Sequence, residues 1–396
     1  MISLGLIKWM ERELEKRKKK LNNVHNQLSQ LTIIIPSFFR QEYLIRQVIL
    51  WAFTDATVII ADGTSEPLSS RLIKIISNIP NISYKHLTDP YASRIRRSSN
   101  YISTPYAMCL ADDDIFLKVG LCHAIDKLNQ DHEILACMGQ TIGVDYDAKI
   151  MRGSYMPYGD SLRSYQVKLQ NPEDRIRYAM DGFRSATAYA VYRTNEFKNI
   201  WQGIQTSSCL EATEYEHAIA TYTLGNLATI EDIYWLKSHE CEPVDSDIEG
   251  TRATTFNLWW KEEEFKDERT SFVKRLTEKL NTNSNLSSKN AKKMIDEAIG
   301  YILKGKHIGL VNQTTSLVLI TRILNTIKLF PIIDNGVQKL RSTTLGITIR
   351  RYTRKIIRGP ELQIVESNMT NKSESIELEL KNNLILIDAF HAAKRF

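Results

Sequence analysis

The chain has 396 residues, 43% of them hydrophobic and 25% charged, and a formal net charge of +6. These are ordinary globular values, and the length exceeds one average domain, so we expect one large domain with additions, or two domains. The five cysteines are widely spaced and form no Cys-x-x-Cys pair, which argues against a disulfide framework or a zinc site and is typical of a reducing cytosol.

The N-terminal residues are apolar first and charged afterwards, the reverse of a secretory signal peptide. No uninterrupted apolar run reaches the roughly 18 to 20 residues that a bilayer span requires. The run from Leu317 to Ile333 comes nearest, but polar residues interrupt it. We therefore expect a cytoplasmic protein that does not span a membrane.

Residues 1–30 predict one helix, because few helix breakers occur and Leu14, Leu21 and Leu28 recur every seven residues. A basic run from Lys16 to Lys20 lies on this helix. Two interpretations stay open. The helix packs on the body of the protein or in a short coiled coil, or it lies on the surface and anchors the protein at an anionic membrane.

From Leu31 onward, short apolar β-branched runs alternate with helix-like stretches. The runs LTIIIPSFF, ATVIIADGT, ISYKHL and PYAMCLADDD predict four strands, and helices are expected between them. Such alternation implies βαβ crossovers and parallel pairing. This part of the chain therefore predicts an open, mostly parallel α/β sheet, which binds ligands at the carboxyl ends of its strands.

Mostly polar residues follow three of the predicted strands, and their side chains are expected to converge on one crevice. These residues are Pro36, Ser37 and Arg40 after the first strand, Asp62 and Gly63 after the second, and Asp112 to Asp114 after the fourth.

The second half of the chain is less regular. Gly139 to Tyr192 predicts loops and short strands, Glu211 to Leu224 a helix, and NLATIEDIYWLKSHE a strand and a turn. Residues 256–306 are helix-like, residues 307–358 alternate apolar and basic segments, and the chain is expected to end in a helical tail.

The three consecutive aspartates Asp112, Asp113 and Asp114 directly follow a hydrophobic run, where like charges repel and an unpaired carboxylate is poorly solvated. A divalent cation removes both penalties, and oxygen ligands suit Mg²⁺ or Mn²⁺. Because residues i and i+2 of a strand face the same way, Asp112 and Asp114 are predicted to act together, with Asp113 directed elsewhere. Alternatively, the triplet opens the next helix, whose N-terminus favours carboxylates.

The segments LTIIIPSFFRQEYL, VIIADGTSEP and PYAMCLADDDIF, in this order and spacing, resemble inverting glycosyltransferases of the GT-A fold. The likeness is greatest to the family-2-type enzymes of bacterial polysaccharide assembly, and it covers about residues 31–240. It implies a Rossmann-like GT-A domain with a mostly parallel central sheet over 31–245. An N-terminal helix (1–30) would precede this domain, and a mainly helical region (246–396) would follow it.

The resemblance also implies a donor site. In this family the aspartate that ends the second strand holds the nucleobase, and the acidic DxD motif holds the ribose and the metal-bound diphosphate. Basic residues before that motif often contact the donor, and we favour Arg94 and Arg97, although a solvated helix face explains them equally well. The implied nucleotide-sugar site consists of Pro36, Ser37, Arg40, Asp62, Arg94, Arg97, Asp112 and Asp113.

A carboxylate at the start of a later helix serves as the base in such enzymes. CLEATEYEHAI offers three glutamates, of which Glu214 aligns best, although no aspartate follows it. Some GT-A enzymes also use a late histidine as a metal ligand, and His239 stands at a corresponding point, although a lone histidine is more often structural. The implied metal ligands are Asp114, as the strongest candidate, Asp112 and His239.

The implied reaction moves a sugar from a nucleotide-sugar donor, expected to be UDP-linked, to a glycan or lipid-linked acceptor in bacterial surface polysaccharide assembly. Mn²⁺ or Mg²⁺ would neutralise the diphosphate leaving group, and the base would take the acceptor proton in one inverting displacement. A retaining mechanism stays open, because some GT-A families with such triplets retain.

Seven cations, without an intervening acid, lie between Lys339 and Arg358 among apolar residues. This pattern is compatible with peripheral contact at the anionic inner face of the plasma membrane, where each cation contributes on the order of 1 kcal/mol. A helix that covers the catalytic domain is the alternative. No nucleic-acid partner is expected, since no RRM, KH or zinc pattern occurs.

Two other functions compete with the glycosyltransferase interpretation. A sugar-1-phosphate nucleotidylyltransferase has a related sheet, but its Gly-rich loop has no counterpart in PSFFRQEY. A non-catalytic glycosyltransferase-like scaffold or glycan-binding protein is the second alternative, and the intact triplet together with Asp62 argues against it.

Overall fold

The computed structural model describes residues 2–19, 26–144, 150–151, 162, 165–238, 240, 255–304 and 374–395. Two of the predicted features, the metal ligand His239 and the basic segment from Lys339 to Arg358, lie outside the described residues. So do many of the residues between Gly139 and Tyr192, where loops and short strands are predicted.

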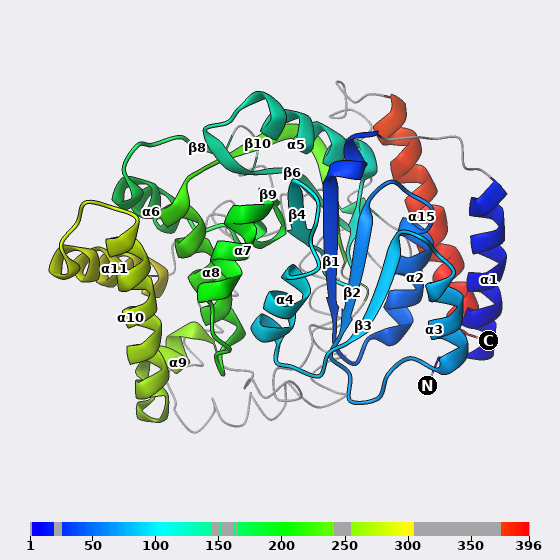
Figure 1. Ribbon diagram of the computed structural model, residues 1–396, viewed down its shortest axis with the longest axis horizontal. Coiled ribbons are helices and arrows are strands. Elements are labelled where there is room, and N and C mark those ends of the chain that lie inside the picture. Colours follow the sequence, from blue (N-terminus) through cyan, green and yellow to red (C-terminus); the bar gives the residue numbers. More distant parts are fainter. Residues whose placement is uncertain are drawn as a thin grey trace, which may run out of the picture.

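Within these residues, ten strands form one central sheet (Figure 1). The strands are β1 Leu31–Ser37, β2 Thr57–Asp62, β3 Ile82–His86, β4 Tyr106–Cys109, β5 Ile115–Phe116, β6 Ile134–Val144, β7 Ile150–Met151, β8 Gln166–Val167, β9 Val191–Arg193 and β10 Asn226–Ser238. The order is β3-β2-β1-β4-β9-β6-β10-β5, with β7 beside β6 and β8 beside β10. Strands β1 to β4 pair in parallel, as do β6 and β10, whereas β5, β7, β8 and β9 are antiparallel to their partners. The predicted mostly parallel α/β sheet is confirmed.

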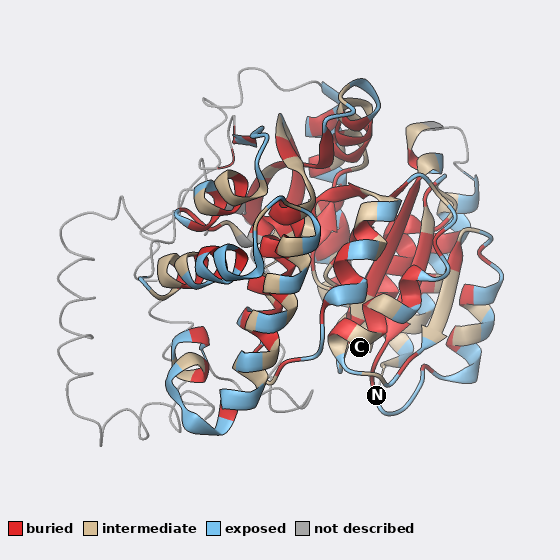
Figure 2. Cartoon of the chain, turned by 60° about the vertical axis from the view of Figure 1, so that its left-hand side comes forward, coloured by how far each residue is buried: buried red, intermediate tan, exposed pale blue. Residues whose placement is uncertain are grey.

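The crossover helices of the first half lie where the sequence predicts them. They are α2 Gln41–Trp51, α3 Ser70–Ser77 and α4 Tyr91–Ser99, and α5 Lys118–Gln130 follows β5. Helices cover both faces of the sheet, so its central strands can be apolar on both sides. Every residue of β1 except Pro36 is buried, and the strands form the buried centre of Figure 2.

The parallel register places several strand ends at one edge of the sheet. Ser37 pairs with Asp62, and Asp62 in turn pairs with His86. Gly63 N donates to Ser37 O over 2.8 Å, which continues the alignment beyond the strands. This edge is where ligands bind in open α/β sheets.

The helix α8 (Leu210–Leu224) lies in a second layer of helices with α6 Pro172–Met180, η4 Ser185–Tyr189 and α7 Thr194–Gly203. Between Ala212 and Thr223, every α8 residue except Glu214 is buried. A helix that is apolar or shielded all round is an internal helix, so α8 is surrounded by protein along most of its length.

The mainly helical C-terminal region is confirmed for its described part. It contains α9 Phe256–Lys261, η5 Glu263–Phe265, α10 Lys266–Thr282 and α11 Ser288–Leu303. Arg275 of α10 donates through Nε and Nη2 to the two carboxylate oxygens of Glu216, both over 2.7 Å. Glu268 accepts hydrogen bonds from the backbone and hydroxyl of Ser208, just before α8. The α10 helix therefore holds α8 in place.

The two ends of the described chain lie side by side (Figure 1). The predicted single helix over residues 1–30 is instead α1 (Leu4–Lys19) and, after residues that are not described, the short 3₁₀ helix η1 (Asn26–Gln30). The apolar face of α1 is buried, and its Trp9 ring lies 6.0 Å from that of Phe390 in α15 (Glu374–Lys394). Among the described helices, none is both long and apolar enough to cross a bilayer.

Candidate functional site

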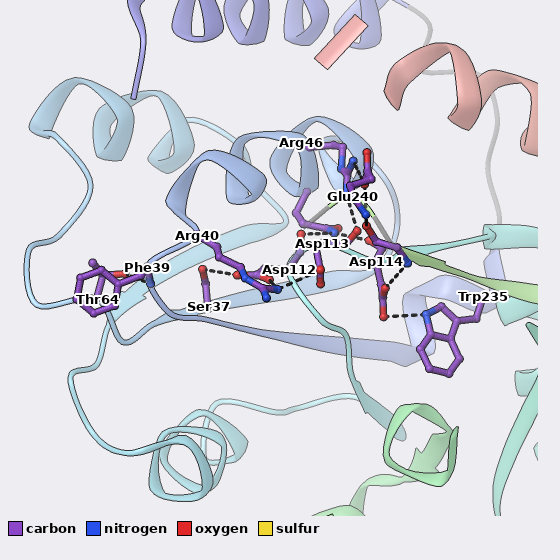
Figure 3. Close-up of polar contacts among 12 residues, drawn as sticks. Ser37, Phe39, Arg40, Arg46, Thr64, Asp112, Asp113, Asp114, Trp235 and Glu240 are labelled. Atoms are coloured by element: carbon purple, nitrogen blue, oxygen red, sulfur yellow. Dashed lines mark hydrogen bonds and ion pairs between the residues drawn. The ribbon is translucent and has the colours of Figure 1, made fainter. Parts of the chain in front are cut away.

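Residues from separate strand ends meet at the carboxyl edge of the sheet (Figure 3). Ser37 Oγ, at the end of β1, donates to Asp112 Oδ2 over 2.7 Å. The loop after β1 is joined to the loop after β2, because Phe39 N donates to Thr64 Oγ1 over 3.1 Å. The structure thus brings Ser37 and the acidic triplet into contact, beside the loop that follows Asp62.

The acidic triplet forms a turn, because β4 ends three residues before it, at Cys109. Two side chains of α2 hold the backbone of this turn. Gln47 Nε2 donates to the first and third carbonyls of the triplet, over 2.9 and 2.5 Å, and Arg46 Nη2 donates to the middle carbonyl over 2.5 Å. All three carbonyls are therefore fixed by one helix.

Asp112 and Asp113 share a cation. Arg40 Nη1 lies 3.4 Å from Asp112 Oδ1 and 3.0 Å from Asp113 Oδ2. Asp114 is turned the other way, toward β10 (Figure 3). The prediction that Asp112 and Asp114 face the same way is wrong for these contacts, because the strand alternation on which it rests ends before the triplet.

Asp114 is buried and is bound by β10. Its carboxylate accepts hydrogen bonds from Trp235 Nε1 over 2.9 Å and from Ser238 N over 2.7 Å. Burial, followed by the negative charge of Asp113, raises the pKa of Asp114 to about 7. The same two causes raise the pKa of Asp112 to about 7. Both carboxylates would therefore be easier to ionise at neutral pH beside an additional positive charge.

The donor chemistry of this turn fits a hard divalent cation that is shared with a substrate. Within the described part of the chain, no group of three or more His, Cys, Asp or Glu side chains could hold a metal ion. However, Mg²⁺ is usually held by one or two carboxylates together with substrate phosphates. An ionised carboxylate offers about four acceptor positions. Asp114 uses two of them for the protein bonds above.

Asp62 is fully buried and joins three elements of the site edge. Its Oδ1 accepts from Thr64 N over 3.0 Å. Its Oδ2 accepts from Gln41 Nε2 of α2 and from the Tyr84 hydroxyl of β3, both over 2.8 Å. The predicted nucleobase ligand therefore also organises the loop in which it lies.

Replacing Asp62 with alanine is expected to lower the free energy of unfolding by about 3–5 kcal/mol, because three donors lose their acceptor inside the protein. Asparagine retains the size and one acceptor oxygen and should cost less. Urea denaturation of the two variants measures the difference. Equal stability of the alanine variant and the unchanged protein would contradict this structural role.

The two arginines predicted to contact the donor have different environments. Arg94 is buried, and its guanidinium lies over Gly63, where a Cβ atom would come within 1.6 Å of Nη1. The same guanidinium lies 5.7 Å from the centroid of the Phe38 ring. Arg97 has a side chain that is 56% exposed and pairs with Asp89. Arg94 therefore belongs to the edge of the site, and Gly63 is needed for its close approach.

Glu214 is the one partly exposed residue in the central part of α8. Its carboxylate accepts no hydrogen bond from any residue that the structure describes. Desolvation by the surrounding protein raises the pKa of Glu214 to about 7, an effect that Lys237 opposes and Glu211 increases. A carboxylate with this pKa can exchange a proton efficiently near neutral pH.

The other two glutamates of this segment are engaged in structural contacts. Glu211 Oε2 accepts from Phe256 N, at the start of α9, over 2.7 Å. Glu216 is buried in its ion pair with Arg275. The choice of Glu214 as the candidate base is therefore the one that the contacts favour.

Lys237 of β10 acts electrostatically on both Glu214 and the acidic triplet. Its positive charge lowers the pKa of both Asp114 and Glu214, against the larger effect of burial. Its ammonium lies 5.2 Å from the centroid of the Trp235 ring, beside the bond from that indole to Asp114. Sequence reasoning missed Lys237 and Trp235. The available signal was their i, i+2 spacing at the end of a predicted strand, which places both side chains on the same face of that strand.

Neither a protein-family model nor a curated protein sequence matches this chain. Similar solved structures include S. aureus TarS 1-349 in complex with UDP-GlcNAc, with a TM-score of 0.49, 12% identity, and coverage of 70% of this chain and 73% of that chain. S. aureus TarS 1-349 in complex with UDP gives a TM-score of 0.41 at 12% identity, over 71% of this chain and 90% of that one. A likeness this distant assigns no function, which has to come from the residues of the site.

Proposed function

We propose that this protein is a metal-dependent glycosyltransferase that uses a nucleotide-sugar donor, with a UDP-linked sugar as the expected substrate. One observation carries the proposal. The buried carboxylates of Asp112 and Asp114 lie at the carboxyl edge of the sheet, where Ser37 binds the first and Trp235 and Ser238 bind the second. Lys237, beside Trp235, acts on both Asp114 and the partly exposed carboxylate of Glu214. Such a set suits a bound cation on one side and a proton acceptor on the other.

The donor would lie along the edge from β2 to the triplet. Asp62 and Arg94 would flank the nucleobase, and Asp112 and Asp113, which Arg40 holds, would face the ribose and diphosphate. Asp114 would hold Mn²⁺ or Mg²⁺ together with the diphosphate, with Asp112 as the alternative ligand, because the two carboxylates are turned in different directions. When bound, such a cation neutralises the charge that develops on the departing diphosphate.

Glu214 would act on the acceptor. Its carboxylate takes the proton of an acceptor hydroxyl as that oxygen forms the bond to the anomeric carbon of the donor and the bond to the diphosphate breaks. One such displacement inverts the anomeric centre. The acceptor is proposed to be a glycan or a lipid-linked sugar of a bacterial surface polysaccharide. From its sequence alone, the basic segment from Lys339 to Arg358 is proposed to contact anionic lipid.

Thermal shift with UDP and GDP, each with and without Mn²⁺, tests the donor assignment. The expected result is a rise in melting temperature with UDP that requires Mn²⁺, and its loss in Asp114→Ala. No metal-dependent shift with either nucleotide would contradict the proposal and favour the non-catalytic scaffold. A shift with UTP and a sugar-1-phosphate, followed by release of pyrophosphate, would instead indicate a nucleotidylyltransferase.

A further inference from the structure

The C-terminal helix α15 contacts the segment that carries the acidic triplet from two directions. Near the start of α15, Glu379 Oε1 and Oε2 accept hydrogen bonds from Lys118 N and Val119 N, over 2.9 and 3.1 Å. These are the first two amides of α5, which begins four residues after the triplet. The carboxylate therefore satisfies two of the helix-terminal donors that lack partners within α5.

The second contact runs through a chain of polar groups that begins at the partly buried His391 and continues through buried side chains. His391 Nε2 lies 2.7 Å from Glu240 Oε1, and Glu240 Oε2 accepts from Arg46 Nη1 over 2.6 Å. Arg46 Nη2 then donates to the middle carbonyl of the triplet, that of Asp113 (Figure 3). Because an ionised carboxylate only accepts, His391 Nε2 carries a hydrogen in this arrangement.

Arg46 is held in a fixed position by its surroundings. Its side chain is 0% exposed, that of Glu240 is 1% exposed, and the guanidinium lies 5.1 Å from the ring centroids of both Tyr43 and Phe390. Phe390 and His391 are neighbours on α15, so this helix contributes both a ring and a polar contact. A guanidinium with two fixed hydrogen-bond directions can set the orientation of the carbonyl that it binds.

Stability alone gives little reason for such an arrangement. Burying two charges costs desolvation energy, and well-packed apolar side chains in place of a buried ion pair are often as stabilising or more so. The chain of contacts ends on the backbone of the turn that supplies the site carboxylates. Its geometry therefore affects the direction of those carboxylates.

We propose that Arg46, Glu240 and His391 are positioning residues, through which the C-terminal helix α15 holds the acidic turn in the orientation that binds the donor and its cation. None of the three is assigned a contact with the substrate. Only the predicted effect on donor binding depends on the function proposed above. The effect on the turn itself is a property of the protein without ligands.

His391→Leu tests the chain of contacts from α15 to the triplet, because leucine removes the hydrogen-bond donor and keeps an apolar side chain at the α15 interface. His391→Gln is the conservative variant, since its amide can still donate to Glu240. Lys394→Ala is the matched control. It lies one turn further along α15 and pairs with Glu42 of α2 over 2.8 Å. Its ammonium also lies 5.1 Å from the centroid of the Tyr43 ring, but no hydrogen bond joins it to Glu240, to Arg46 or to the triplet among the described residues. Arg46→Lys is a second test. It retains the positive charge and removes the guanidinium, whose Nη1 and Nη2 bind Glu240 and the Asp113 carbonyl at the same time.

Amide hydrogen exchange over residues 111–117, without ligand, gives the first measurement. His391→Leu and Arg46→Lys are expected to exchange about tenfold faster there than the unchanged protein, equivalent to about 1.4 kcal/mol of local opening. His391→Gln and Lys394→Ala should exchange at the original rate. Equal exchange in His391→Leu and the unchanged protein, or equally faster exchange in Lys394→Ala, would overturn the proposal.

Calorimetric titration with UDP in the presence of Mn²⁺ gives the second measurement. Outer-shell partners of metal ligands typically change affinity about 10- to 100-fold, so we expect His391→Leu to weaken UDP binding about tenfold and Lys394→Ala to leave it unchanged. Unchanged affinity in both His391→Leu and Arg46→Lys would overturn the positioning role. If the unchanged protein fails to bind UDP with Mn²⁺, the proposed donor is wrong, and hydrogen exchange still decides the role of α15.

Discussion

Replacing Glu214 with glutamine is expected to lower kcat for sugar transfer by about 10²- to 10⁴-fold, the usual contribution of a general base. Glutamine retains the size of the side chain and removes its ability to take a proton. Because Glu214 accepts no hydrogen bond from the described residues, the change breaks no contact seen in the structure. KM for the donor should change little. Steady-state kinetics with a UDP-sugar and a soluble acceptor measure both constants.

Glu211→Gln is the matched control for this experiment. It lies one turn earlier on α8, and its side chain accepts from Phe256 N, a bond that the glutamine oxygen can also accept. Because the charge of Glu211 also raises the pKa of Glu214, the enzymes are compared well above pH 7, where Glu214 is ionised in both, and the kcat of Glu211→Gln should then stay close to that of the unchanged enzyme. A Glu214→Gln enzyme with normal kcat, or a Glu211→Gln enzyme that is equally impaired, would show that the base is another group.

The raised pKa of Glu214 also predicts the pH dependence of the reaction. The base must be ionised, so kcat/KM should fall as pH falls below about 7.

The effect of the same pKa on the free energy of unfolding has the opposite dependence on pH. Because the folded state favours the protonated form, the contribution of Glu214 to stability declines as pH rises from its unfolded pKa near 4.5 to about 7. Glu214→Gln should therefore be more stable than the unchanged protein at about pH 8, by roughly 1 kcal/mol or more, and not at about pH 4.

Replacing Asp114 with asparagine is expected to remove Mn²⁺-dependent UDP binding and to lower kcat/KM by about 10²- to 10³-fold, the range found when one electrostatic partner of a developing charge is lost. Asparagine keeps the volume of the buried side chain. Its oxygen can still accept from either Trp235 Nε1 or Ser238 N, but the neutral amide lacks the negative charge that attracts a divalent cation. Calorimetry with UDP and Mn²⁺ gives the affinity.

Asp232→Asn provides the comparison on the same strand. Asp232 is partly exposed and pairs with His123 over 2.8 Å, without contact to the triplet. UDP affinity and kcat/KM should be unchanged in this variant. Retention of Mn²⁺-dependent binding in Asp114→Asn would remove Asp114 from the metal site and leave Asp112 as its remaining described candidate.

The parallel core and the site at its edge were predictable because their signals are local. Short β-branched runs between amphipathic stretches can pair only through crossovers, and parallel strands place their carboxyl ends at one edge. That reasoning was enough to bring Ser37, Asp62 and the triplet together. It failed for the direction of Asp114, because β4 ends at Cys109, three residues before the triplet, and the alternation of side chains along a strand does not extend into the turn that follows.

The amino-acid sequence by itself determined the order of strands and helices, the edge where ligands would bind and the carboxylates that stand there. Tertiary structure alone decided what surrounds those carboxylates. Lys237, Trp235 and Arg46 reach the site from β10 and α2, and Glu240 and His391 join it from segments about 130 and 280 residues away along the chain. Burial and charge act through space, so the raised pKa of Glu214 and the support of the triplet by α15 depend on contacts that no local pattern encodes.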